Sequence, residues 1–119
     1  MLGAVDIGGT KTLVAVFDKH RKIIEQVKFL TPIDYEEFKI QLANVVANLS
    51  TKDFLKVVVA APGRIDRDKG IGIAFGNLPW KNVHLEADFE KIFLAPVLIE
   101  NDAKLAGLSE ALEIKDKYK

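Results

Sequence analysis

A glycine turn near the start of the chain has the residue types that bind phosphate. An apolar run over residues 2–5 leads into Asp6, and Gly8-Gly9-Thr10 precede a second apolar run at 12–17. Glycines lack a Cβ, so such a turn bends sharply and points backbone N–H groups at an anion, while the Thr10 hydroxyl adds a donor. A carboxylate such as Asp6 suits a hydrated Mg²⁺ that the phosphates share. The pattern predicts a hairpin that grips phosphate.

Three alternatives apply to this turn. The P-loop pattern Gly-x-x-x-x-Gly-Lys-Ser/Thr fails, because Gly9 stands where the lysine is required. The dinucleotide pattern Gly-x-Gly-x-x-Gly is absent from the turn, and no helical pattern follows it. An ordinary tight hairpin, in which the glycines only supply positive φ, stays open.

A second polar group, Glu100-Asn101-Asp102, lies between a short apolar run and a helical pattern. In open α/β sheets, ligands bind at such strand ends. Helix N–H groups keep a carboxylate ionised, so Asp102 suits a general base for a substrate hydroxyl, and Asn101 can orient that hydroxyl. Alternatively, Asp102 is only the N-cap of the last helix. A phosphate grip and a base together are what phosphoryl transfer to a hydroxyl requires.

Hydrophobic periodicity predicts the elements that would position these groups. The connections between the first three expected strands are short, so these strands are expected to be antiparallel neighbours. Asp34 with Glu37 resembles a capping box, and apolar residues recur at helical spacing after it. The expected elements are strands at 2–6, 12–17, 23–30, 54–61 and 95–99, and helices at 34–50, 84–93 and from about 102. The order βββαβαβα is an α/β fold with a mixed five-stranded sheet flanked by helices. The glycine-rich stretch at 63–80 indicates a hairpin or ordered loop beside a cleft.

Length and composition indicate one globular domain over residues 1–119. Lys and Arg number 17, as do Asp and Glu, so no general field attracts nucleic acid or an anionic membrane, and neither is expected as a partner. The absence of cysteine excludes disulfides and thiolate metal sites. With neither a signal peptide nor a membrane-spanning apolar run, the expected compartment is the cytoplasm.

Four motifs, in this order, make the chain resemble the ROK family of sugar kinases, within the actin-like, hexokinase-like ATPase superfamily. They correspond to the family's first phosphate motif, its sugar-proximal Pro-Gly turn, its Asn-Leu-Pro-Gly-Trp segment and its catalytic Glu-Asn-Asp-Ala. In this chain they read Asp6-Ile7-Gly8-Gly9-Thr10-Lys11-Thr12, Ala61-Pro62-Gly63-Arg64-Ile65-Asp66, Asn77-Leu78-Pro79-Trp80 and Glu100-Asn101-Asp102-Ala103.

The resemblance implies a ribonuclease-H-like N-terminal lobe of a glucokinase-like sugar kinase, with a sugar as substrate and ATP and Mg²⁺ as cofactors. It implies that Asp102 is the general base and that Asn101, Gly63 and Asn77 contact the sugar. The phosphates of ATP would be held by Gly8, Gly9, Thr10 and Lys11. Asp6 would bind Mg²⁺ through water. Taken without the resemblance, Asn77 suits a plain turn as well as a sugar contact. The residue types favour a solvated charge for Lys11 and a core anchor for Trp80.

The chain also departs from the family pattern. The glycine expected between Pro79 and Trp80 is missing, and Lys104 is close enough to Asp102 to lower the pKa of its carboxyl. The family's second, C-terminal lobe is absent from these 119 residues, so little kinase activity is expected from the lobe alone. A non-catalytic sugar-binding or regulatory ROK protein is the main alternative. A homodimer of half-lobes is a further one.

Overall fold

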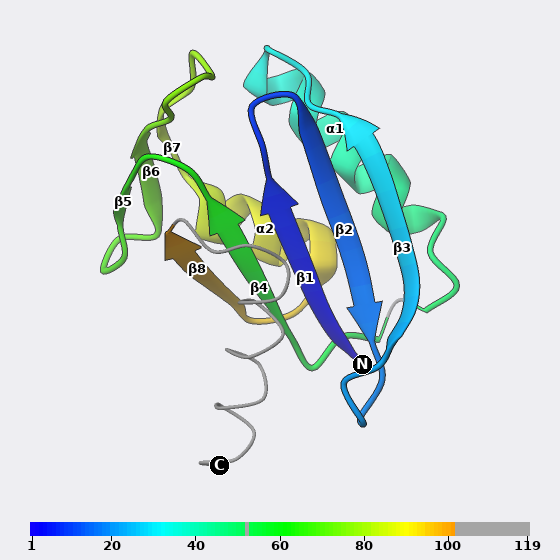
Figure 1. Ribbon diagram of the computed structural model, residues 1–119. Helices are drawn as coiled ribbons and strands as arrows, with labels where there is room; N and C mark the ends of the chain where they lie inside the picture. Colours follow the sequence, from blue (N-terminus) through cyan, green and yellow to red (C-terminus); the bar gives the residue numbers. More distant parts are fainter. Residues whose placement is uncertain (52, 102–119) are drawn as a thin grey trace.

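The computed structural model describes residues 1–51 and 53–101, which form a five-stranded sheet, a small three-stranded sheet and two helices (Figure 1). The strand order in the larger sheet is β3-β2-β1-β4-β8. The first three strands form an antiparallel meander, and β4 and β8 run parallel to β1. The bounds are Leu2–Ile7 for β1, Lys11–Phe17 for β2, Ile23–Leu30 for β3, Lys56–Ala61 for β4 and Val97–Asn101 for β8. The predicted mixed five-stranded sheet is confirmed.

Helices α1 (Tyr35–Ala47) and α2 (Leu85–Phe93) both cover one face of this sheet (Figure 1). Side chains alternate along a strand, so every second residue of β1 and β4 faces the helices. The main core forms there from Val5, Ile7, Val57, Val59, Phe38, Leu42, Val46, Leu85, Phe89 and Phe93, among others. On the other face, β1, β2 and β4 bury a second, smaller cluster of Leu2, Ala4, Ala15, Phe17, Val58 and Ala60. The helices predicted at 34–50 and 84–93 are confirmed, and the observed ends of α1 and α2 differ from the predicted ends by at most three residues.

The stretch at 63–80 departs from its prediction. It forms a hairpin, as expected, but a third strand joins it to make a separate sheet of β5 (Arg64–Asp66), β6 (Ile71–Ala74) and β7 (Lys81–Val83). The strand that was not predicted, β7, has only three residues, which are too few for a period-two pattern to be recognised. The order βββαβαβα is therefore interrupted by three short strands between β4 and α2. The last predicted helix lies outside the described residues.

Trp80 anchors this small sheet to the main core. Its side chain is 3% exposed, and its ring centroid lies 4.7 Å from that of Phe38 and 5.1 Å from that of Phe75. The indole Nε1–H donates to the backbone carbonyl of Ile33 at 2.7 Å, so its one polar atom is satisfied. Trp80 is therefore the core anchor that its residue type suggests.

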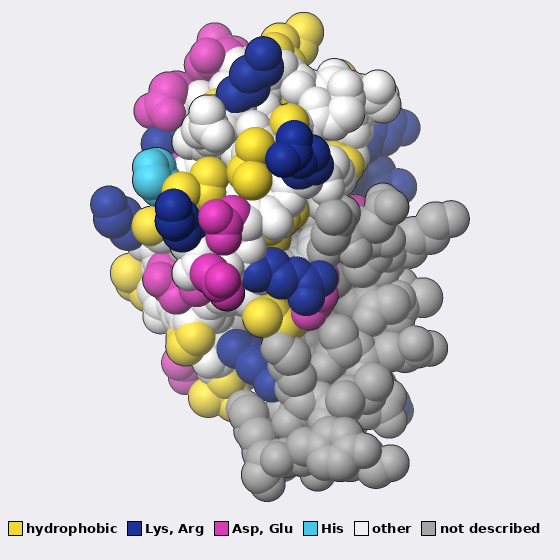
Figure 2. All heavy atoms as spheres, turned by 90° about the vertical axis from the view of Figure 1, so that its left-hand side faces the viewer, with side chains coloured by type: hydrophobic (Ala, Val, Ile, Leu, Met, Phe, Trp, Pro, Cys, Tyr) yellow, Lys and Arg dark blue, Asp and Glu magenta, His cyan; other side chains and the backbone are white. Residues whose placement is uncertain are grey.

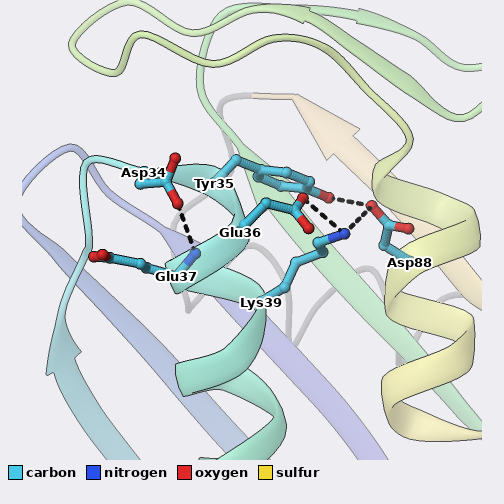
Figure 3. Close-up of polar contacts among 6 residues, drawn as sticks. All are labelled: Asp34, Tyr35, Glu36, Glu37, Lys39 and Asp88. Atoms are coloured by element: carbon cyan, nitrogen blue, oxygen red, sulfur yellow. Dashed lines mark hydrogen bonds and ion pairs between the residues drawn. The ribbon is translucent and has the colours of Figure 1, made fainter.

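Polar contacts at the start of α1 join the two helices (Figure 3). Asp34 caps α1 by accepting a hydrogen bond from the Glu37 amide at 3.1 Å. The Tyr35 hydroxyl donates to Asp88 of α2 at 2.7 Å, and Lys39 lies 3.8 Å from the same carboxylate oxygen. Burial, followed by this hydrogen bond, raises the pKa of Tyr35 far above its ordinary value, so the phenol stays protonated and keeps donating. These contacts fix α1 against α2 beneath the sheet.

The surface carries charges of both signs. Figure 2 shows the side with the three-stranded sheet, where basic and acidic side chains are interspersed among apolar ones. Within residues 1–51 and 53–101, no helix is both long and apolar enough to cross a membrane.

Candidate functional site

The candidate site residues that the structure describes gather at one edge of the five-stranded sheet. Asp6 of β1 pairs in register with Ala60 of β4, and Ala60 pairs with Glu100 of β8. One residue further on, Ala61 pairs with Asn101. Because β1, β4 and β8 are parallel, their carboxyl ends meet at the same edge. The order of the chain therefore brings Asp6 and Asn101 together across 95 residues, at the place where open α/β sheets bind ligands.

The glycine turn between β1 and β2 is closed by its own backbone. The Gly8 amide donates to the carbonyl oxygen of Lys11 at 3.0 Å. A Cβ on Gly8 would lie 2.5 Å from that oxygen, so a side chain at this position would open the turn. Neither Gly8 nor Gly9 has a positive φ. Positive φ, the reason that the ordinary-hairpin alternative gave for these glycines, is therefore wrong. Close approach of the backbone is what requires glycine at position 8.

Gly9 touches the Asn77 segment. A Cβ built on Gly9 would lie 2.9 Å from the Cβ of Asn77 and 3.4 Å from its Nδ2. Asn77 is exposed, so its amide is accessible to solvent beside the turn. Two motifs that are 68 residues apart in sequence thus meet at a glycine. Thr10 and Lys11, which complete the turn, are also exposed.

Gly63 is required by its own backbone conformation. Its φ is +90°, a region that residues with a Cβ rarely adopt, and a Cβ there would lie 2.1 Å from the carbonyl oxygen of Ala74. Gly63 also lies against the backbone of Phe75, two residues before Asn77. The turn after β4 therefore packs against the segment that presents Asn77.

The Asp6 carboxyl has the surroundings of a cation ligand. It is half-buried, and burial raises its pKa above the ordinary value. Among the described side chains and amides, none donates a hydrogen bond to it or forms an ion pair with it. A half-buried carboxylate without a protein partner is stabilised in its charged form by a cation. In residues 1–51 and 53–101, no three acidic, histidine or cysteine side chains form a metal cage. Asp6 thus fits Mg²⁺, which keeps several waters and binds through one or two carboxylates plus phosphates.

Glu100 differs from Asp6 because it has a partner. Its carboxylate lies 3.1 Å from the Arg67 guanidinium, which extends from the turn after β5, and the pair is partly open to solvent. The ion pair links the small sheet to the end of β8. Sequence reasoning missed Arg67, because nothing in its local pattern points to a partner 33 residues away. It also missed Thr31, whose hydroxyl donates to the carbonyl oxygen of Gly8.

The structure leaves part of the predicted site untested. Asp102 and Lys104 lie outside the described residues. Asn101 is placed by its backbone, as the last residue of β8. The histidines His20 and His84 are both exposed.

The fold is that of a lobe of the actin-like ATPase class. Its marks are the mixed sheet in the order β3-β2-β1-β4-β8, the helices that cover it, and the polar residues at the carboxyl ends of its parallel strands. The sequence profile of the ROK family matches residues 2–118. The chain therefore belongs to the ROK family, and the resemblance drawn from the four motifs is confirmed.

Individual relatives agree with this assignment. The chain is 30% identical over 107 residues to the glucokinase of Streptomyces coelicolor, a match that covers 89% of this chain and 34% of that protein. It resembles the crystal structure of a ROK family glucokinase from Streptomyces griseus in complex with glucose and AMPPNP, with a TM-score of 0.75 and 31% identity over 86% of this chain and 33% of that one. It is also 34% identical over 59 residues to the xylose repressor of Caldicellulosiruptor bescii, over 50% of this chain and 15% of the repressor. The chain spans about a third of the length of the glucokinases it matches.

Proposed function

We propose that this chain is the N-terminal lobe of a sugar kinase that transfers the γ-phosphoryl group of ATP to a sugar hydroxyl. The observation that carries the proposal is the contact between Gly9 and Asn77. That contact places the segment that would hold the phosphates against a segment that would hold the sugar. Phosphoryl transfer is mostly a matter of positioning and charge neutralisation, so such a contact is what the reaction needs.

The donor half of the site is the glycine turn with Asp6. We assign the phosphates of ATP to the backbone N–H group of Gly9, the hydroxyl of Thr10 and the ammonium of Lys11. Gly8, whose own N–H is bonded to the Lys11 carbonyl, would line the phosphate site by keeping the turn closed. The Lys11 side chain is exposed, and the described acidic residues leave it without an ion pair, so it can reach a bound anion. Asp6 would hold Mg²⁺ through water, and the ion would neutralise charge on the phosphates.

The acceptor half consists of Gly63, Asn77 and Asn101, with Asp102 next in the chain. The amide of Asn77 can donate to and accept from sugar hydroxyls, and the backbone of the exposed Gly63 can hydrogen-bond to them as well. The Asp102 carboxylate would accept the proton of the attacking hydroxyl. As the oxygen of that hydroxyl bonds to the γ-phosphorus, the bond from phosphorus to the β–γ bridging oxygen breaks, and ADP leaves.

A single lobe holds the phosphates from one side only. Water then reaches the reacting atoms, so we expect the 119-residue chain by itself to turn over slowly or not at all. Because ATP is its donor, we place the kinase in the cytoplasm.

A regulatory ROK protein is the second candidate, and the match to a xylose repressor over half the chain favours it. Such a protein would bind a sugar without transferring phosphate. The two candidates therefore differ in whether Mg²⁺ and ATP bind at the glycine turn.

Sugar-dependent release of ADP tests the proposal. It is measured over a panel of hexoses on the protein that is encoded by the whole reading frame containing this chain. Loss of a positioned general base lowers kcat by about 100-fold to 10,000-fold, and Asp102→Asn should do so with little change in KM. Glu110→Gln changes another carboxylate in the same predicted helix and is the matched control. Full turnover in Asp102→Asn would remove Asp102 as the base, whereas sugar binding without ATP binding would favour the regulatory protein.

A further inference from the structure

Thr31 connects the end of β3 to the glycine turn through both its side chain and its backbone. The hydroxyl donates to the carbonyl oxygen of Gly8 at 2.9 Å, and the amide donates to the carbonyl oxygen of Thr10 at 2.8 Å. Thr31 is 8% exposed, so water competes little for these bonds. One residue outside the turn therefore fixes the carbonyls on both sides of Gly9.

A second buried hydroxyl fixes the orientation of Thr31. The Thr12 and Thr31 oxygens lie 2.7 Å apart, and Thr12 is fully buried. A hydroxyl has a single proton to donate. Since the Thr31 proton is used on Gly8, Thr12 is the donor in this pair. The chain of hydrogen bonds therefore has one direction, from Thr12 to Thr31 to Gly8, and each member is satisfied.

The same segment also holds the Asn77 side of the site. Two residues after Thr31, the carbonyl oxygen of Ile33 accepts the hydrogen bond from Trp80 Nε1. Trp80 ends the segment that begins at Asn77. Residues 31–33 are thus bonded both to the glycine turn and to the segment that packs against it.

We propose that Thr31 is a positioning residue for the glycine turn. By holding the Gly8 carbonyl, it fixes the peptide plane that contains the Gly9 N–H, and therefore the direction of the backbone donor that would meet the phosphates. By holding the Thr10 carbonyl, it fixes the other side of Gly9. Its relevance to phosphate binding rests on the function proposed above, but its hold on the turn does not.

Four variants separate a hydrogen-bonding role of Thr31 at the turn from a role in packing. Thr31→Val keeps the shape and the backbone amide and removes the hydroxyl, while Thr31→Ser restores the hydroxyl. Thr12→Val removes the other hydroxyl but leaves the bond from Thr31 to Gly8 in place. Thr51→Val makes the same chemical change in the loop before β4, and it is the matched control for the substitution itself.

The first readout is amide hydrogen exchange of the ¹⁵N-labelled chain without ligand. The Gly8 amide is bonded within the turn, so a loosened turn exposes it more often. A lost hydrogen bond of ordinary strength predicts about tenfold faster exchange at Gly8 in Thr31→Val. Exchange in Thr31→Ser and Thr51→Val should lie within about twofold of the original chain, on the scale of ordinary variant differences. Unchanged Gly8 exchange in Thr31→Val, or failure of Thr31→Ser to restore it, would overturn the proposal.

The second readout is a titration with Mg²⁺ and AMPPNP, followed at the amides of Gly8, Gly9 and Thr10. Thr31→Val should raise the apparent Kd about tenfold, whereas Thr12→Val should raise it less than about threefold. Equal affinities of Thr31→Val and the original chain would contradict the role in phosphate binding. If the original chain shows no shift at these amides, the proposed kinase function fails, while hydrogen exchange still decides whether Thr31 holds the turn.

Discussion

Gly63 gives the sharpest test of why the site has its shape. An alanine there would have to adopt φ of +90° and would place its Cβ 2.1 Å from the Ala74 carbonyl oxygen. Positive φ costs a residue with a Cβ about 1–2 kcal/mol, and displacing a strand carbonyl weakens a hydrogen bond worth about 1 kcal/mol. The stiffer unfolded chain returns about 0.4–1 kcal/mol. Gly63→Ala should therefore lower the free energy of unfolding by about 2 kcal/mol.

The matched control is Gly76→Ala in the same segment. A Cβ at Gly76 meets no atom within 4 Å, and its φ is not positive, so this change should stay within about 0.5 kcal/mol. Urea unfolding followed by circular dichroism measures both variants, and the midpoint of thermal unfolding should fall by roughly 10 °C for Gly63→Ala. If the two variants are equally stable, the backbone does not require glycine at position 63. Its presence would then have to be explained by contact with the sugar alone.

Two further predictions concern stability. Burial raises the pKa of Asp6 in the folded protein, so folding favours the protonated form of this carboxyl. The contribution of Asp6 to stability is therefore fully present below its unfolded pKa near 3.8 and is lost as pH rises through the raised pKa. Asp6→Asn should therefore raise the thermal midpoint at pH 7 but not at pH 3, and it should weaken Mg²⁺-dependent nucleotide binding; a lower midpoint at pH 7 would contradict this reasoning. Phe38 is fully buried among the rings of Phe29, Trp80 and others. Phe38→Ala should therefore lower the free energy of unfolding in urea by about 3–5 kcal/mol. A loss below about 1 kcal/mol would mean that this aromatic cluster is not the centre of the core.

The larger elements were predictable because each has a long periodic signal. The valine-rich run of β4 and the amphipathic α1 were recognised, although β4 begins at Lys56 rather than at residue 54. The cap at Asp34 was also recognised, because a capping aspartate acts on an amide three residues away. Strand β7 was missed because three residues carry no period, and it exists only because β6 lies beside it.

The candidate site was likewise predictable only in part. Residue types alone indicated that Asp6 and the glycines suit phosphate, and that Asn101 and Asp102 suit a hydroxyl. The reason for the glycines was not readable from the sequence. Gly8 and Gly9 avoid collisions with Lys11 and Asn77, and collisions exist only once the chain is folded.

By itself, the sequence indicated which chemistry the candidate residues suit and predicted the order of the main elements, because residue type and hydrophobic period are local properties. Tertiary structure alone decided which groups meet. The parallel pairing of β1, β4 and β8 brings Asp6 and Asn101 to one edge. Tertiary structure also decided two polar contacts: the ion pair between Arg67 and Glu100, and the hydrogen bond from Thr31 to the Gly8 carbonyl in the glycine turn. These partners are 33 and 23 residues apart, and no local pattern encodes a contact that arises only when the strands pair.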